Sequence, residues 1–490
     1  MAQPAPLSSP PAPASSPEGE EAPRKWMILA AISISLFLGS VDGSIVNVSL
    51  PTLVRELSTD FPTVQWVVLS YLLGLTTLML SMGRLADISG KRRIFSTGLV
   101  LFLIGSALCG LSPTIYWLIA FRFVQSVGAS MMLALGVAIV TETWPDYERG
   151  KTIGITGGVI SLGIVAGPAI GGIILEHLSW HWIFMVNVPI GAVALGMVLL
   201  YVPPLLPTTK GETFDLLGAA IVGGGLLSFA LALTIGQKIG FTAPLSLTLL
   251  ALGLLAMPLF VWQENRVRYP MIDLSLFRNV NFSLNLFNGV LSFIAIAAVV
   301  LLLPFYLELV LGLSSQNVGF LMAATPLVLG VLSPISGAMS DRWGTRPVSV
   351  LGLIFIVIGY STMTLLGTDS TPWHFVLYLL PVGIGMATFQ SPNNSAVMGA
   401  VPRQRLGVAS GTLSMSRTLG QVTGIALLGA FFASRLNHHA GAAVDVSQAS
   451  REVIVLALRD QFTFAAILIG IGLFLSLARW WQEVRSARRQ

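Results

Sequence analysis

Charged residues are scarce in this 490-residue chain: Asp, Glu, Lys and Arg make up only 10% of it, whereas 54% is hydrophobic. A soluble protein of this length needs a charged surface, so the composition excludes that class. Apolar runs of about 20 residues recur along the chain, and each is long enough to cross about 30 Å of hydrocarbon as a helix. Runs such as Leu291 to Leu303 do not alternate in polarity as barrel strands do. We therefore predict an all-α polytopic membrane protein.

Groups that carry other chemistries are also few. Cys109 is the only cysteine, so no internal disulfide can form and the redox compartment stays open. The chain has no glycine-rich phosphate loop of the Walker type, which argues against ATP-driven pumping. The adjacent pair His438-His439 lies in the longest predicted outer loop, where neighbouring side chains diverge, so we expect no metal site. We also expect no cofactor and no enzyme activity, and the small net charge of +5 gives no indication of a nucleic-acid partner.

Fourteen membrane spans are predicted. The first, from Trp26, is long, contains Asp42 and lacks a convincing cleavage site, so we expect it to be retained rather than removed as a signal peptide. A tail rich in Pro, Ala, Ser and Glu at 1–25 is expected to be disordered, and a basic tail occupies 481–490. The spans lie at 27–48, 65–83, 94–112, 114–138, 153–175, 184–202, 216–236, 244–262, 285–306, 318–339, 348–366, 374–397, 409–433 and 461–480.

Positive charge is distributed unevenly between the two sides of this map. With the N-terminus inside, twenty of the 27 Lys and Arg residues fall in inner segments and five in outer ones, while Arg122 and Arg417 lie within spans. Because short cytoplasmic loops carry the excess of Lys and Arg, we expect both termini to be cytoplasmic. The expected location is a cell membrane, such as the inner membrane of a bacterium, with the lipid bilayer as a partner.

One inner loop occurs twice. The stretch Gly83–Arg93 contains five charges in eleven residues, and a looser copy at Gly337–Arg346 begins 254 positions later. Each copy lies between the second and third spans of a six-span unit. We therefore predict two related bundles at 26–202 and 283–480, with linker segments and two inserted spans at 203–282. Duplicated helical units with a site between them are the common plan of secondary transporters.

Five short patterns, in the right spans and order, resemble those of the major facilitator superfamily, and the resemblance extends from about residue 27 to 480. They are Gly83–Arg93, Asp42–Pro51 in the first span, Arg122–Gly128 in the fourth, Gly163–Gly172 in the fifth and Trp180–Phe184 at the start of the sixth. The fourteen-helix drug:proton antiporter branch fits best, and the fifth-span pattern resembles one typical of exporters. The resemblance implies the major facilitator fold, with two six-helix bundles plus two inserted transmembrane helices, and multidrug-type efflux by alternating access.

Asp42 is a carboxylate inside an apolar helix, where insertion scales give a cost of about 2.5 to 3.5 kcal/mol. It should therefore face a cavity or a partner. Counting about 1.5 Å per residue from the outer ends of their spans places Asp42 and Arg122 at similar depth, and Gln125 lies one turn from the arginine. We expect the three to meet, either as a proton-coupling and substrate site or as a fixed ion pair that steadies two helices. A carboxylate there can hold a proton or a cationic substrate in turn, which is a simple antiport device.

Other residues in the spans have side chains suited to contact with varied apolar cations or to hydrogen bonding at membrane depth. Core packing or helix–helix contact is the alternative for each. Glu308, at the outer end of span nine, is expected to face lipid headgroups and is a weaker coupling candidate. Arg417 is expected to act in gating or structure rather than in substrate contact. The cavity candidates are Asn47, Trp66, Tyr71, Phe305, Tyr306, Phe389, Gln390, Asn393 and Asn394.

Gating and structural roles are expected for two further sets of residues. Asp87 is placed to accept an ion pair or cap contact that steadies the outward-open state, and the charges near it hold orientation. Glycines at four-residue spacing in the fifth span allow close helix approach, and a proline there allows a kink. The second loop copy lacks the basic triplet, so we expect the amino-half gate to be the stronger one. The sets are Gly83, Asp87, Gly90, Arg92, Arg93, Asp341 and Arg342 in the loops, and Gly163, Gly167, Pro168 and Gly171 in the fifth span.

The function expected from these features is proton-coupled efflux of small cationic or amphipathic drug-like compounds. Its partners are then the substrate and protons, and we expect a monomer to be functional. Two alternatives share the same motifs: export of one defined metabolite, antibiotic or lipid, and proton-linked uptake, which the exporter-like glycine pattern disfavours. A receptor or channel is least favoured, because duplicated halves with a buried carboxylate fit alternating access better.

Overall fold

Long helices make up nearly all of the described chain. The computed structural model describes residues 18–144, 148–205, 215–267, 274–401 and 406–487. Fourteen helical segments in these residues are long and apolar enough to cross a membrane, and each coincides with one predicted span, so the predicted count is confirmed. The α-helices are α1 (Glu18–Glu56), α2 (Phe61–Ser89), α3 (Lys91–Gly110), α4 (Ile115–Thr143), α5 (Arg149–His177), α6 (Trp182–Met185), α7 (Asn187–Tyr201), α8 (Leu216–Ile239), α9 (Pro244–Glu264), α10 (Val280–Phe305), α11 (Ser315–Met322), α12 (Ala324–Trp343), α13 (Thr345–Met363), α14 (Pro372–Gly399), α15 (Leu406–Ala440) and α16 (Arg451–Ala487).

The helices form two groups with the same internal pairing. In the group α1–α7, α1 packs against α5 and α2 against α4, and these are spans one, five, two and four. In the group α10–α16, α10 packs against α15 and α12 against α14, which are the corresponding spans of the second unit. The inserted pair α8 and α9 pack on each other, and α8 contacts α2 and α15. The chain therefore consists of two six-span bundles with two inserted spans.

The duplicated loop has the same backbone geometry in both copies. Gly90 joins α2 to α3 with φ +91°, and Gly344, 254 positions later, joins α12 to α13 with φ +87°. In each case the glycine N–H donates to the carbonyl four residues earlier, Ala86 at 2.8 Å and Ser340 at 2.9 Å. These φ values are nearly confined to glycine, which explains why this residue recurs at the same place in both copies.

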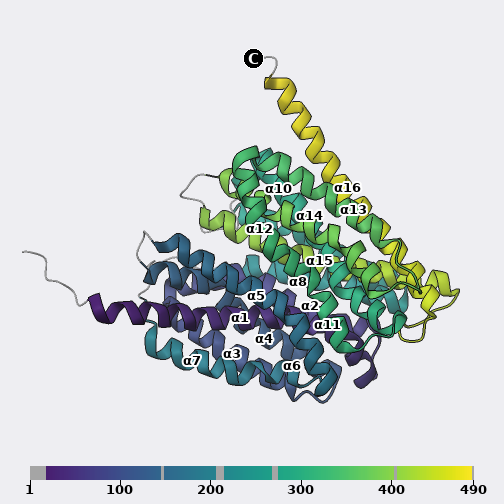
Figure 1. Ribbon diagram of the computed structural model, residues 1–490, viewed down its shortest axis with the longest axis horizontal. Helices are drawn as coiled ribbons and strands as arrows, with labels where there is room; N and C mark the ends of the chain where they lie inside the picture. Colours follow the sequence, from purple (N-terminus) through teal and green to yellow (C-terminus); the bar gives the residue numbers. More distant parts are fainter. Residues whose placement is uncertain (1–17, 145–147, 206–214, 268–273, 402–405, 488–490) are drawn as a thin grey trace, which may run out of the picture.

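The hydrophobic core shows that the two groups meet at one end and separate at the other. One large cluster combines the predicted outer ends of both groups, for example Val54 and Phe61 with Phe305 and Phe432. At the predicted inner ends, each group has its own cluster, one around Ile94 and the other around Phe282, Leu286, Val397, Ala409 and Leu413. The helices accordingly diverge toward the amino-terminal end of α1 and the carboxy-terminal end of α16 (Figure 1).

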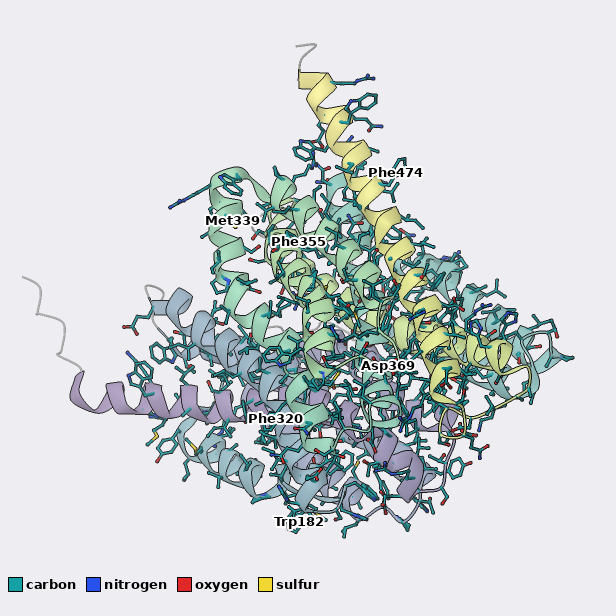
Figure 2. The ribbon with its side chains drawn as sticks, turned by 45° about the vertical axis from the view of Figure 1, so that its right-hand side comes forward. Trp182, Phe320, Met339, Phe355, Asp369 and Phe474 are labelled. Atoms are coloured by element: carbon teal, nitrogen blue, oxygen red, sulfur yellow. The ribbon has the colours of Figure 1, made fainter. Side chains whose placement is uncertain are left out.

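Polar contacts also join the two groups at the outer ends. Arg55 of α1 forms an ion pair with Glu308, in the π-helical turn that follows α10. The Phe61 N–H donates to Asp445 Oδ2 at 2.9 Å. In Figure 2, Phe320 of α11 lies where the groups meet, whereas Met339 of α12 lies at the opposite end of the second group. The conformation is therefore closed at the predicted outer side.

The inserted helix α8 is tied to the same end. Lys238 pairs with Asp60 at 2.7 Å and donates to the Thr63 hydroxyl at 2.8 Å. Desolvation raises the pKa of Asp60, but the Lys238 ammonium and the Thr63 hydrogen bonds outweigh it, so the pKa of this carboxyl lies below its ordinary value. The ionised carboxylate is thus stabilised by the fold.

Three details differ from the sequence predictions. Helix α1 begins at Glu18, inside the tail expected to be disordered, of which residues 1–17 lie outside the described chain. Helix α16 begins at Arg451, although a loop was expected up to residue 460. Arg459, in this additional part of the helix, donates a hydrogen bond to the Leu366 carbonyl, between α13 and α14. The Glu308 side chain is only 10% exposed, because Arg55 and not the headgroup layer is its partner.

Candidate functional site

Asp42 of α1 and Arg122 of α4 form a buried ion pair. Arg122 Nη1 lies 2.6 Å from Asp42 Oδ2, and the side chains are 1% and 0% exposed. Arg122 Nε also donates to the Val67 carbonyl of α2 at 3.1 Å. The structure therefore brings together the two charges that were expected to lie at the same depth.

Gln125 bridges the two charges. Its Oε1 accepts from Arg122 Nη1 at 2.6 Å, while its Nε2 donates to Asp42 Oδ1 at 2.8 Å and to Ser106 Oγ at 2.7 Å. Asn187 Nδ2 of α7 donates to the same Asp42 oxygen at 3.0 Å. The carboxylate thus accepts three hydrogen bonds, a pattern that fits its ionised form, which only accepts.

Aromatic rings close the site around the guanidinium. Arg122 Cζ lies 4.1 Å from the centroid of the Tyr71 ring and 5.7 Å from that of Phe184. Both distances are within the range of cation–π attraction, which is strengthened when the cation is desolvated. Tyr71, a predicted cavity residue, is buried against the ion pair in this conformation.

Sequence reasoning missed Ser106 and Asn187. Asn187 follows the Trp180–Phe184 pattern closely and is a lone amide at the start of the apolar helix α7, which is the signal that could have found it. Ser106 gave no signal, because a serine in a helix commonly bonds to its own backbone. Each supplies a side chain that helps to satisfy the buried network.

The network is enclosed in this conformation. Asp42, Gln125 and Ser106 are fully buried, and Asn187 is 1% exposed. A substrate cannot touch the carboxylate unless the helices around it move. The exchange of proton and cationic substrate on Asp42 that the sequence predicted therefore requires a conformational change before substrate can take part.

The glycines of α5 pack where they were expected to permit close approach. A Cβ on Gly163 would lie 2.8 Å from Ser40 Cβ, and one on Gly171 would lie 2.8 Å from Ile45 Cγ1, while Gly167 faces Ser44. All three face α1, the helix that carries Asp42. Pro168 lies in the interior of α5, and its carbonyl contacts Gly319 of α11 in the other group.

Most of the other cavity candidates are buried in the core. Tyr306 donates to the Gly367 carbonyl at 2.8 Å, and Phe305 packs on Phe61 with 5.3 Å between ring centroids. Phe389 lines only a small cavity of about 20 Å³ within the second group. The remaining candidates are Asn47, which bonds to its own helix, Trp66, which packs on the core, buried Asn393, and partly buried Gln390 and Asn394.

The predicted gate residues are only partly defined. The side chain of Asp87 lies outside the described residues. Arg92 donates to the Leu199 carbonyl at 2.6 Å, and Arg93 is exposed. Asp341 and Arg342 are exposed and form no hydrogen bond or ion pair with the described part of the chain. A Cβ on Gly83 would meet no atom within 4 Å. The expected difference in strength between the two gates stays a prediction.

Arg417 has no comparable partner among the residues that the structure describes. It lies in α15, where its Nε is buried without a hydrogen bond and its Cζ is 5.9 Å from the Phe293 ring centroid. Its position, eleven residues after the start of α15, is about 16 Å into the helix.

Comparison with known proteins identifies the family. The family model described as Major Facilitator Superfamily matches residues 32–425 and 285–489. The chain belongs to the major facilitator superfamily. It is 35% identical over 465 residues to the riboflavin transporter RibZ of Clostridioides difficile, covering 93% of this chain and 97% of that protein. It is 32% identical over 413 residues to the multidrug resistance protein Stp of Mycobacterium tuberculosis, covering 84% and 76%.

A solved structure has the same fold. A bacterial homologue of the human lysosomal transporter Spinster, in an inward-facing and unoccupied conformation, superposes with a TM-score of 0.67 at 15% identity, covering 93% of this chain and 97% of that one. As a member of this superfamily with fourteen spans, the protein is a multi-pass membrane transporter whose relatives include multidrug resistance proteins.

Proposed function

We propose that this transporter couples inward proton movement to the export of small amphipathic, drug-like compounds, with Asp42 as the proton-carrying group. The observation that carries the proposal is the buried network of Asp42, Arg122 and Gln125. Ionisable side chains at membrane depth are costly and are retained where protons or ions move. The relative named as a multidrug resistance protein supports drug-like substrates, and the glycine pattern of α5 supports export.

The hydrogen bonds indicate which protonation state belongs to this conformation. A protonated Asp42 would have to donate its O–H, yet the neighbouring Arg122 and Asn187 nitrogens are themselves donors. Protonation would also leave the Arg122 charge without its partner, and breaking a buried pair costs about 3 to 5 kcal/mol. The conformation closed at the outer side therefore favours the deprotonated carboxylate, so a proton that Asp42 has bound is released in this conformation.

Proton release in this conformation is the step that allows antiport. With the cavity open inward, Asp42 is deprotonated and substrate binds between the two groups. After the change to the outward-open state, a proton from outside binds Asp42 and substrate leaves. The protonated protein returns and releases its proton inside. Helix α1 connects the steps, because it carries Asp42, packs on the α5 glycines and contacts α10 of the second group.

The membrane orientation is part of the proposal. The excess of Lys and Arg in the loops at the diverging end supports a cytoplasmic position for both termini. We propose bundles at 26–202 and 283–480 as the two moving halves, with 203–282 as an insertion and a monomer as the functional unit.

A second candidate is transport of one defined metabolite. The 35% identity to a riboflavin transporter over 93% of this chain favours a flavin-like planar heterocycle. The same Asp42 network would serve this substrate, in either direction, because the network fixes proton binding rather than substrate identity.

Transport into vesicles tests the proposal. Purified protein in liposomes receives an imposed pH gradient, and the movement of rhodamine 123, ethidium and riboflavin is followed by fluorescence. We expect rhodamine 123 and ethidium to move against the proton flux, at rates that collapse with an uncoupler. Movement of riboflavin alone would establish the second candidate, and gradient-independent movement of every compound would refute proton coupling.

A further inference from the structure

A polar stripe runs along one face of α15. At 3.6 residues per turn, Ser410, Ser414, Arg417 and Gln421 share a face with Phe432, farther along the helix. Phe432 packs on Phe61 of α2, with ring centroids 5.5 Å apart. That face is therefore directed at the amino-terminal group. Nearer the start of α15 the two groups have separate cores, and on this face Ser410 is exposed while Ser414, Arg417 and Gln421 are half-buried.

The charge at the centre of this stripe has no ion-pair partner in the described part of the chain. Arg122 and Arg346 have carboxylate partners, and Arg459 donates to a carbonyl. Arg417, in contrast, forms no hydrogen bond or ion pair with any residue the structure describes, and its Nε is buried. About 16 Å from the helix start, it lies near the middle of a hydrocarbon layer of about 30 Å. A charge at that depth is expensive unless something pairs with it.

No carboxylate that the structure describes pairs with Arg417. Helices α10, α14 and α15 contain no Asp or Glu, and in the adjacent helix α16 Asp460 pairs with Arg435 and Glu483 with Arg346. On the opposite side, Asp42 is fully buried and bound to Arg122. The interior of the second group therefore presents a positive charge toward the substrate region, with hydroxyl and amide groups beside it on the same face.

We propose that Arg417 is a substrate-binding residue that pairs with an anionic group, such as a carboxylate, sulfonate or phosphate, on an otherwise apolar substrate. The inference rests on the proposed transport function and adds that amphipathic substrates with an anionic group are preferred over those without one. The guanidinium supplies charge-assisted hydrogen bonds in a fork geometry that matches such groups. Phe293, 5.9 Å from the guanidinium, gives an apolar surface beside it.

The test uses two dyes that share one xanthene skeleton. Rhodamine 110 carries a free carboxylate, and rhodamine 123 is its methyl ester. Binding to the purified full-length protein is measured by fluorescence polarisation without any pH gradient. We expect wild type to bind rhodamine 110 more tightly than rhodamine 123. The Arg417→Gln substitution should weaken the binding affinity for rhodamine 110 by about tenfold to a hundredfold and change that for rhodamine 123 by less than about twofold. The affinity of Arg417→Lys for rhodamine 110 should be intermediate.

Arg459→Gln is the matched control, because it removes another arginine of the second group that lies on α16 and not on the stripe; it should preserve the dye preference. Thermal unfolding distinguishes a loss of binding from a loss of folded structure. The Arg417→Gln substitution removes a charge that pairs with no described residue, so it should leave the melting temperature unchanged or raise it. Equal binding of both dyes by wild type, or an equal loss of both in Arg417→Gln, would overturn the inference. Because no gradient is present, failure of proton-driven transport in vesicles would refute the proposed function without altering this result.

Discussion

The contact between Gly172 of α5 and Gly319 of α11 should control whether the outer side stays closed. A Cβ on Gly172 would lie 2.5 Å from the Ser315 carbonyl oxygen and 3.0 Å from Gly319 Cα. These are backbone atoms, which cannot rotate away as a flexible side chain can. The Gly172→Ala substitution therefore forces α5 and α11 apart in this conformation.

The size of the effect follows from overpacking. Inserting one methyl group into such a contact costs about 1 to 3 kcal/mol, and the cost falls only on the conformation in which the helices touch. The ratio of outward-open to outward-closed protein should therefore rise about 5-fold to 150-fold. Gly158→Ala is the matched control on the same helix, because a Cβ there would meet no atom within 4 Å.

Spin-label distances measure this ratio. Glu56 and Asn317 are exposed residues at the outer ends of the two groups, and the single native cysteine, Cys109, is buried. Labelled cysteines at 56 and 317 should show an added population at longer distance in Gly172→Ala and none in Gly158→Ala. Identical distance distributions in wild type and Gly172→Ala would refute the role of this contact in closing the outer side.

Three further predictions concern stability. The Asp42→Asn substitution should lower the free energy of unfolding by about 3 to 5 kcal/mol, because it leaves Arg122 buried without its partner. In thermal unfolding, the double variant Asp42→Asn/Arg122→Gln should recover part of this loss. Gly90→Ala should cost about 1 to 3 kcal/mol because of its positive φ, whereas Gly83→Ala should have no such cost; equal melting temperatures would contradict the backbone argument. Because the pKa of Asp60 is lowered in the folded protein, the ionised carboxylate stabilises the fold above about pH 4, and this contribution is lost as the pH falls further. The melting temperatures of wild type and Asp60→Asn should therefore differ at pH 6 and converge in acid. A difference that stays constant with pH would refute this.

The spans and the central ion pair could be predicted from the sequence for simple reasons. Hydrocarbon thickness fixes the length of an apolar run, and the fourteen apolar runs correspond to fourteen candidate membrane-spanning segments in the described residues. The cost of a charge at membrane depth required Asp42 to have a partner, and equal depth pointed to Arg122. Both arguments use only the position of a residue along its own helix, so neither requires knowledge of how the helices pack.

Features that depend on packing between distant helices could not be predicted. Glu308 was expected to face headgroups, but its partner Arg55 lies 253 residues away and meets it only because the two groups close at the outer side. Asn187 reaches Asp42 from α7, and no spacing in the sequence signals that approach. Arg417 was expected to serve structure or gating; the absence of a partner among the described residues became visible only when the neighbouring helices were known.

The central claim is that Asp42 carries the coupled proton, and vesicle transport by wild type and Asp42→Asn tests it most directly. Accumulation of substrate driven by a pH gradient is compared with exchange of labelled for unlabelled substrate at equal pH. We predict that Asp42→Asn inserts and exchanges substrate but loses accumulation driven by the gradient. Undiminished accumulation in Asp42→Asn would contradict the account.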